Sequence, residues 1–413
     1  MIDHGPSDEV DLAISAASCK LRNQNPAIAP DDNGEHTEQR LAKCRSHMRG
    51  AALRGAGRLP IFRGEARPRA GAMQGKSPMF PLSILDLAFI AEGATAADAL
   101  HNSRDLARHA EKLGYTRFWL AEHHNMTGIA SAATSVAIGY VAEGTKTIRV
   151  GAGGIMLPNH SPIVIAEQFG TLETLYPGRI DLGLGRAPGT DQRTWRALRR
   201  EADASERFPQ DVLELQALLG PLQPDQVIQA VPGTNTNVPL WILGSSLFGS
   251  QLAAVLGLPY AFASHFSPDA LMDALSVYRE RFQPSAQRDK PYAMVGCNVI
   301  AAETDAEAQY LFTSVQQRFA DMLRGRRGLL PRPIDDIEDY WSGPEKAQAQ
   351  RMLACSFVGS RESVRSQLQA FIEKTKADEL IVASAIFDHA ARKRSYEILA
   401  EIQPALGLAA VAA

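Results

Sequence analysis

A carboxylate and two adjacent imidazoles end an apolar run in the stretch FWLAEHHN, residues 118–125. Three interpretations of Glu122, His123 and His124 are open: a buried structural cluster, a metal site, or the acid/base end of a catalytic pocket. Neighbours on an extended segment point to opposite sides, so only Glu122 and His124 share a face, which disfavours a metal site. A histidine can donate or accept a proton near neutral pH, so an acid/base role for one of the two imidazoles stays open.

A second group of residues could bind an anion. Gly244, Ser245 and Ser246 precede a predicted helix, whose free N–H groups and positive dipole end attract phosphate. Arg186 would add a permanently charged, bidentate partner. Taken singly, the two serines are an ordinary helix N-cap and Arg186 is a surface arginine or a partner of Asp191. Together they favour an anionic cofactor.

Eight short apolar runs alternate with helical stretches after residue 82 and predict parallel βα units. The predicted strands are 83–89, 116–121, 147–153, 179–185, 239–244, 259–264, 294–302 and 379–385. Helices are expected near 96–113, 131–143, 162–176, 191–219 and 389–403. The pattern fits an α/β fold, a (β/α)8 TIM barrel with an insertion between strands seven and eight. A doubly wound open sheet is the alternative, but no GxGxxG follows the first strand.

The barrel prediction places the candidate residues together, because catalytic groups lie at the carboxyl ends of barrel strands. The EHH motif follows strand two, and Arg186 and the two serines follow strands four and five. Further polar residues on this rim are His160 after strand three and Ser264-His265 after strand six.

Glycines 151, 153 and 154 end strand three. They could relieve crowding at a barrel corner, or let a flat ligand lie directly against the backbone. A planar ring system with a phosphate tail accounts for the glycines and for the Arg/Ser group, and flavin mononucleotide (FMN) has this shape.

Composition excludes several other classes. The chain has 413 residues, 45% hydrophobic, with a net charge of -3, which argues against general nucleic-acid affinity. No apolar run is long enough to span a bilayer, and four scattered cysteines suit a reducing cytoplasm. Residues 1–78 show no sustained period; we expect a disordered extension or a start codon placed too far upstream, followed by one domain over 79–413.

The chain resembles the luciferase-like flavin monooxygenases, the family of bacterial luciferase, from about Leu82 to Ile402. The resemblance is carried by FWLAEHHN, TIRVGAGGIMLPNHSPIVIAEQFGTL, GRIDLGLGRAPG, WILGSS, GLPYAFASHF and ELIVASAIFDHAARKRSYEILAEI. It matches the small single-gene members. What it implies is a two-component monooxygenase that receives reduced FMN from a separate NAD(P)H:flavin reductase and oxygenates a small organic substrate through a C4a-hydroperoxyflavin. We expect a cytoplasmic homodimer.

The resemblance also implies roles by position. His123 would be the catalytic histidine, with Glu122 and His124 supporting its placement. Arg186, Ser245 and Ser246 would bind the phosphate, next to Gly185. Glycines 153 and 154 match a bulge on strand three where related proteins hold a non-proline cis peptide against the flavin.

One position departs from bacterial luciferase, which has a cysteine where this chain has Gly185. The departure speaks against light emission but not against flavin binding. Two other functions stay open: a deazaflavin (F420) oxidoreductase using the same rim, and a non-catalytic flavin-binding protein, against which the intact EHH motif argues. The long segment 321–350, rich in Arg, Gly and Pro, is predicted to be a lid over the rim.

Overall fold

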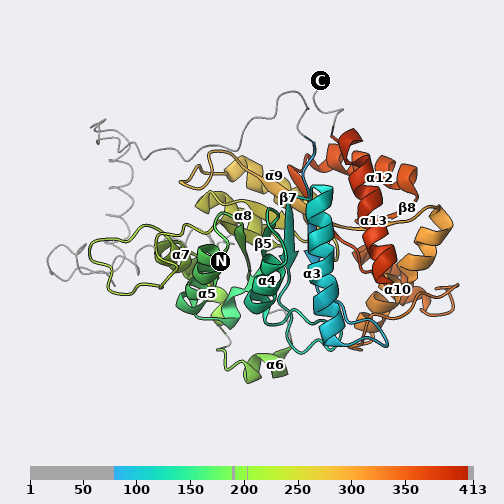
Figure 1. The fold of residues 1–413 in the computed structure, drawn as a ribbon, viewed down its shortest axis with the longest axis horizontal. Helices are drawn as coiled ribbons and strands as arrows, with labels where there is room; N and C mark the ends of the chain where they lie inside the picture. The colour runs from blue at the N-terminus through green and yellow to red at the C-terminus, as the bar shows by residue number, and fades with distance from the viewer. Residues whose placement is uncertain (1–78, 188–190, 202, 408–413) are drawn as a thin grey trace, which may run out of the picture. The chain divides into compact units, whose positions relative to one another are not determined.

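The computed structural model describes residues 79–187, 191–201 and 203–407. Within them a parallel sheet closes into a ring, with helices packed around its outside (Figure 1). The strands are β1 (Leu82–Asp86), β2 (Arg117–Leu120), β3 (Arg149–Met156), β4 (Ile180–Gly185), β5 (Leu240–Gly244), β6 (Tyr260–Phe262), β7 (Ala293–Ala301), β8 (Ser356–Gly359) and β9 (Glu379–Ala383). The ring runs β1 to β7 and then β9, and it closes because β6 pairs with β7 and β9 pairs with β1.

Helices follow the strands in the alternating order of a βα barrel. They are α3 (Ala96–Leu113), α4 (Thr134–Glu143), α5 (Pro162–Leu175), α6 (Gln192–Ala197), α7 (Phe208–Leu219), α8 (Leu247–Leu256), α9 (Leu271–Arg281), α10 (Asp305–Leu323), α11 (Gly343–Met352), α12 (Arg361–Thr375) and α13 (His389–Ile402). Short 3₁₀ turns lie at Leu157–Asn159, Ala204–Arg207 and Gln403–Ala405.

The predicted (β/α)8 barrel is confirmed, with all eight predicted strands present as β1 to β7 and β9. The helix predicted over 96–113 has the bounds of α3, where a Thr95–Asp98 capping box begins the helix and its buried side chains form one stripe. The insertion differs from expectation. It contains a ninth strand, β8, which pairs with the carboxyl-terminal half of β7. Its sequence, Ser-Phe-Val-Gly, has only two large apolar residues and so forms no recognisable apolar run.

The segment predicted as a lid, 321–350, is also more regular than expected. It includes the end of α10 and most of α11, and only the connection between them, residues 324–342, is without helix or strand. The expectations for residues 1–78 lie outside the described residues. In the described part, no helix is long and apolar enough to cross a membrane.

Side chains alternate along each strand between the barrel interior and the surrounding helices. On β2, Phe118 and Leu120 join the large core under the helices, whereas Trp119 and the next inward residue, Ala121, join the smaller interior cluster. The other members of that interior cluster are Leu85, Trp241, Ala261, Met294, Ile381 and Ala383, with partly buried Leu87, Leu243 and Tyr292 against them.

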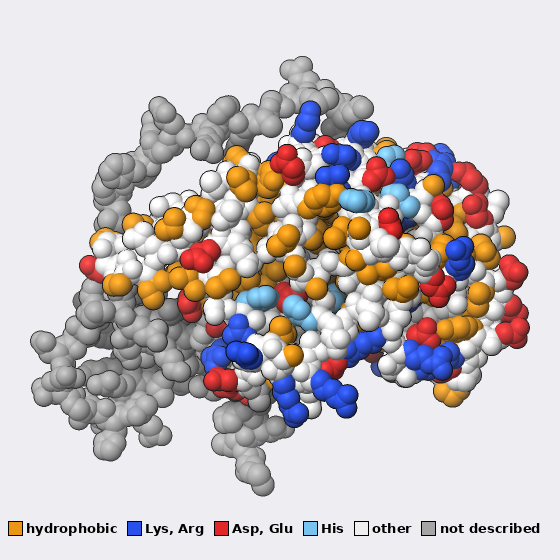
Figure 2. Space-filling view, turned by 60° about the horizontal axis from the view of Figure 1, so that its bottom comes forward, with side chains coloured by type: hydrophobic (Ala, Val, Ile, Leu, Met, Phe, Trp, Pro, Cys, Tyr) orange, Lys and Arg blue, Asp and Glu red, His pale blue; other side chains and the backbone are white. Residues whose placement is uncertain are grey.

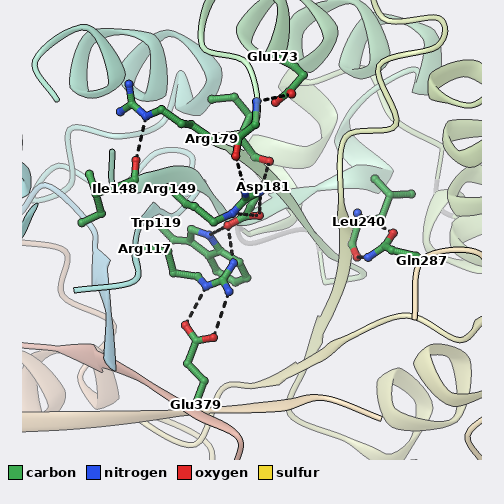
Figure 3. A network of polar contacts seen from close by, with 12 residues as sticks. Arg117, Trp119, Ile148, Arg149, Glu173, Arg179, Asp181, Leu240, Gln287 and Glu379 are labelled. Atoms are coloured by element: carbon green, nitrogen blue, oxygen red, sulfur yellow. Dashed lines mark hydrogen bonds and ion pairs between the residues drawn. The ribbon is translucent and has the colours of Figure 1, made fainter. Parts of the chain in front are cut away.

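The amino-terminal end of the barrel interior is closed by a buried charged network (Figure 3). Arg117 donates to Asp181 at 2.6 Å and to Glu379 at 2.8 and 3.2 Å. Trp119 Nε1 donates to Asp181 at 3.1 Å, and Arg149 donates to the other oxygen of Asp181. Every charge in this group has a partner of opposite sign, which is how ionic groups are tolerated in a core. Because it lies at the end away from the βα loops, we assign it to stability.

Candidate active site at the carboxyl ends of the strands

Glu122 is the centre of a polar cluster just beyond β2. Its side chain is 1% exposed, and Oε1 lies 2.6 Å from Nε2 of His124 and 2.9 Å from Nε2 of His160. The amide of Asn159 donates to Oε1 at 3.2 Å, and the backbone N–H of Met156 donates to Oε2 at 2.9 Å. The cluster thus joins the segment after β2 to the segment after β3.

The charge on this carboxylate is strongly stabilised. Burial by itself would raise the pKa of Glu122, but hydrogen bonds from His124 and His160, together with positive charge on His160, lower it to about 2. The hydrogen bond to Glu122 in turn raises the pKa of His124. An ionised Glu122 that holds two imidazoles is therefore the state at neutral pH.

The same three groups have the donor set of a metal site. One ligand atom from each of Glu122, His124 and His160 lies within 4.8 Å of the others. Both oxygens of the carboxylate already accept hydrogen bonds, and these bonds account for its burial without an ion. We therefore describe the cluster as a support for the segment. The sequence argument against a metal counted only Glu122 and His124 on one face, and the structure adds His160 to them.

His123 stands outside this hydrogen-bonded cluster. It lies two residues beyond Ala121, a member of the interior cluster, and close enough to His265 for its charge to lower the pKa of that residue. Its Nδ1 is buried and has no hydrogen-bond partner among the described residues. Burial lowers the pKa of His123, so the ring is neutral at pH 7 and offers one donor and one acceptor nitrogen.

The expected bulge and cis peptide on β3 are present. The Gly153–Gly154 bond is cis, and the pairing of β3 with β4 shifts register between Ala152 and Ile155. A Cβ on Gly153 would lie 2.9 Å from Leu85 Cδ1 and 3.0 Å from the Trp119 ring, so close packing already requires glycine there. The carbonyl of Gly154 accepts from the backbone N–H of Glu122 at 3.2 Å, which ties the bulge to the EHH segment.

Arg186 and the start of α8 lie together, as the sequence predicted. The guanidinium carbon of Arg186 lies 4.0 Å from the ring centre of Phe248, in the first turn of α8. Ser246 occupies the N-cap position but makes no capping hydrogen bond with its side chain, and Ser245 precedes it. The first N–H groups of α8 are consequently available to an anion beside an exposed arginine.

One alternative from the sequence, an ion pair between Arg186 and Asp191, is not formed. Asp191 does not pair with Arg186; it caps α6 through Thr194 and forms an ion pair with Arg327. Gly185 ends β4, and a Cβ there would lie 3.0 Å from the sulfur of Met156, a contact that a flexible side chain can relieve.

These residues occupy one end of the barrel, the end at which α6 lies. Figure 2 shows histidine side chains gathered near the middle of this face, with apolar surface above them and basic side chains below. An orphaned imidazole nitrogen, glycines at the bulge and an open helix start beside an arginine suit a flat ring with a phosphate tail. The described residues therefore fit a flavin nucleotide.

The structure shows contacts of three residues, His160, His265 and Asn159, that the sequence did not predict. Sequence reasoning placed His160 and His265 on the rim, but it did not foresee that His160 binds Glu122 or that His265 is buried with an unpartnered Nδ1. It did not single out Asn159, whose amide also binds Glu122. The available signal was the spacing: each follows a predicted strand end, where side chains from distant segments converge.

Comparison with known proteins decides the family. The family model for luciferase-like monooxygenases matches residues 80–379. The chain belongs to the luciferase-like monooxygenase family. A luciferase-like monooxygenase of Escherichia coli K12 is 56% identical over 325 residues, covering 78% of this chain and 97% of that protein. The N-acetyl-S-alkylcysteine monooxygenase of Bacillus subtilis is 31% identical over 331 residues, covering 78% and 98%.

Solved structures agree with this assignment. The crystal structure of apo-MsnO8 is 36% identical and matches with a TM-score of 0.69, covering 78% of this chain and 98% of that one. The oxygenating constituent of 3,6-diketocamphane monooxygenase, in complex with FMN, has a TM-score of 0.59 at 18% identity, with 80% and 99% covered. The second likeness shows the fold alone. Family membership makes the chain an oxidoreductase of the monooxygenase type.

Proposed function

We propose that this chain is the oxygenase of a two-component system, which binds reduced FMN and uses O₂ to oxygenate a small organic substrate. The observation that carries the proposal is a convergence. Arg186 and the start of α8, which could bind an anion, and His123, whose buried Nδ1 has no partner among the described residues, all follow the carboxyl ends of barrel strands.

Each group of residues at the rim has its own role in this proposal. Arg186 and the N–H groups of α8 would bind the phosphate, and glycines 153 and 154 would let the ring approach the backbone of β3. Glu122 orients its segment through His124, His160 and the carbonyl of Gly154. Neutral His123 would donate or accept a proton at the reacting edge of the ring.

Reduced flavin, when bound, supplies the electrons that activate oxygen. The protein's own part is to exclude water, hold the ring and move the proton. The described residues form one barrel with its insertion and no second nucleotide-binding domain, which supports delivery of reduced flavin by a separate NAD(P)H:flavin reductase.

The test is an anaerobic titration of the purified chain with FMN, reduced FMN and F420, followed by protein fluorescence. We expect reduced FMN to bind more tightly than F420. Tighter binding of F420 would assign deazaflavin chemistry instead, and binding of neither would overturn the proposal.

Turnover then separates an oxygenase from a non-catalytic flavin protein. The Bacillus subtilis relative named for N-acetyl-S-alkylcysteines makes thioethers of this class the first substrates to test. With reduced FMN supplied by an added reductase, we expect substrate-dependent consumption of O₂ and an oxygenated product detected by mass spectrometry.

A further inference from the structure

His265 occupies a position across the barrel from His123. On β6, Ala261 faces the barrel interior, and His265 lies in the turn that follows this strand, with its ring packed against Gly296 of β7. In a ring that runs β1 to β7 and then β9, β2 and β6 stand four strands apart, which is the greatest separation possible. The segments that follow β2 and β6 therefore start on opposite sides of the ring, and each carries one imidazole. The two rings are close enough for a positive charge on His123 to lower the pKa of His265.

The two rings share an unusual feature. Nδ1 of His123 and Nδ1 of His265 are both buried and both lack a hydrogen-bond partner among the residues the structure describes. A buried polar atom without a partner loses its hydrogen bonds to water and gains none in return, so such atoms in a native protein call for an explanation. A ligand that lies between the two rings and bonds to both nitrogens provides one.

Contacts with residues of β7 fix the position of His265. A Cβ on Gly296, the facing residue of β7, would lie 2.7 Å from Nδ1 of His265, so only glycine leaves room for the ring. Asn298 donates to the backbone carbonyl of His265 at 2.7 Å, and the hydroxyl of Ser264 donates to the carbonyl of Gly296. These contacts place the imidazole without using its Nδ1.

Both rings are uncharged at neutral pH. Burial, together with the unfavourable effect of a positive charge on His123, lowers the pKa of His265 to about 4. Each neutral imidazole has one donor and one acceptor nitrogen, so the pair suits an uncharged ligand edge that carries both donors and acceptors.

We propose that His265 is a flavin-binding residue, whose Nδ1 forms a hydrogen bond with the polar edge of the flavin ring on the side of the mouth opposite His123. The inference rests on the proposed function and adds a specific contact to it. The pyrimidine edge of the ring carries alternating acceptors and donors, and the small side chain of Ala121 in the barrel interior leaves room for a flat ring near the imidazoles.

The experiment measures dissociation constants for riboflavin, which has the ring without the phosphate, and for FMN. His265→Phe keeps a ring of similar shape and removes both nitrogens. We expect it to weaken riboflavin and FMN by the same factor, about tenfold, the size of one lost hydrogen bond to a buried partner. His265→Asn places an amide near the position of Nδ1 and should restore most of the affinity.

Two further variants make the result specific. Gly296→Ala displaces the His265 ring without removing it and should weaken both ligands. Asp269→Ala, on the same connection but with an exposed side chain, should change neither. In the wild-type protein with ¹⁵N-labelled histidine, the Nδ1 resonance of His265 should shift when riboflavin binds.

Failure of the inference is distinguishable from failure of the proposed function. If the wild type binds riboflavin while His265→Phe and Gly296→Ala bind it equally well, His265 does not contact the ring and the proposed function stands. If the wild type binds no flavin, both are overturned. If His265→Phe does not fold, His265→Asn, Gly296→Ala and the Nδ1 resonance decide the question.

Discussion

Arg327 and Asp191, 136 positions apart, form an ion pair that joins the insertion to the rim of the barrel. Arg327 also donates to the backbone carbonyl of Asn125, directly after the EHH motif, at 2.9 Å. Nearby, a Cβ on Gly128 would lie 2.1 Å from the carbonyl oxygen of Gly328, so the two segments are in close backbone contact. The connection 324–342 is thus docked against the segment that carries His123, as a closed lid would be.

Breaking this contact should uncouple the reaction. We expect Arg327→Ala to leave FMN affinity nearly unchanged and to divert O₂ into hydrogen peroxide, because the mouth would be less protected from water. The measurement is the ratio of peroxide to oxygenated product. Arg351→Ala, which removes an exposed ion pair with Asp269 in the same insertion, is the control and should keep the wild-type ratio. An unchanged ratio of peroxide to product in Arg327→Ala would show that the Arg327–Asp191 ion pair has no part in turnover.

Removal of the proposed acid/base should affect rate and not binding. We expect His123→Ala to slow turnover by about 10² or more while flavin affinity and melting temperature change little. Because burial lowers the pKa of His123, the acidic limb of the wild-type rate profile should lie below pH 6.5. His101→Ala, at an exposed position of α3, serves as the control. Turnover of His123→Ala within a few-fold of wild type would remove this residue from the mechanism.

Phosphate recognition can be separated from ring binding at Arg186. Arg186→Ala should weaken FMN by roughly 1.5–3 kcal/mol, the usual effect of losing a hydrogen bond to a charged group, and leave riboflavin unchanged. Titration of both ligands by fluorescence checks this. Equal losses for the two ligands would mean that the arginine does not contact the phosphate.

The Glu122 cluster should give stability a characteristic pH dependence. The pKa of Glu122 is lowered from 4.5 to about 2, so its contribution is complete above pH 4.5 and is lost as the pH falls through about 2. The pKa of His124 is raised from 6.5, so its contribution is complete below pH 6.5 and is lost as the pH rises through the folded-state value. Between pH 4.5 and 6.5, Glu122 and His124 therefore both make their full contribution to the free energy of unfolding.

Glu122→Gln should therefore lower the free energy of unfolding most in that window, by about 2–4 kcal/mol at pH 5.5, and by less at pH 8.5. Urea unfolding at the two pH values measures the difference. Glu362→Gln, at an exposed carboxylate paired with Arg365, should change stability little at either pH. An equal loss at both pH values would contradict the assigned protonation states.

The buried network at the other end of the barrel should matter for stability alone. Arg117→Met leaves Glu379 buried without its arginine partner, and we expect a loss of about 3–5 kcal/mol in the free energy of unfolding. Arg149→Met should cost less, because Arg149 is partly exposed and Asp181 keeps Arg117. Riboflavin affinity of folded Arg117→Met should match wild type; a large change in affinity would link this network to the site.

The residues of the EHH motif show how much of the candidate site could be predicted from the sequence. Two-residue alternation separates His123 from Glu122 and His124, and in the structure Glu122 and His124 meet in one cluster with His160 that His123 does not join. Apolar runs that alternate with helical stretches revealed all eight strands of the ring, and the ends of those strands marked the rim. Strand β8, Ser-Phe-Val-Gly, escaped because it has only two large apolar residues and forms no such run.

The sequence by itself determined which side of each element faces inward and which residues stand at strand ends, because both depend only on local periodicity. Tertiary structure alone decided the partners: His160 with Glu122, Arg186 over Phe248, Arg327 with Asp191, and His265 opposite His123. These relationships depend on closure of the ring and on packing between elements far apart in the chain. A periodic pattern states how a strand faces its own sheet, but not which side chain of another strand it meets.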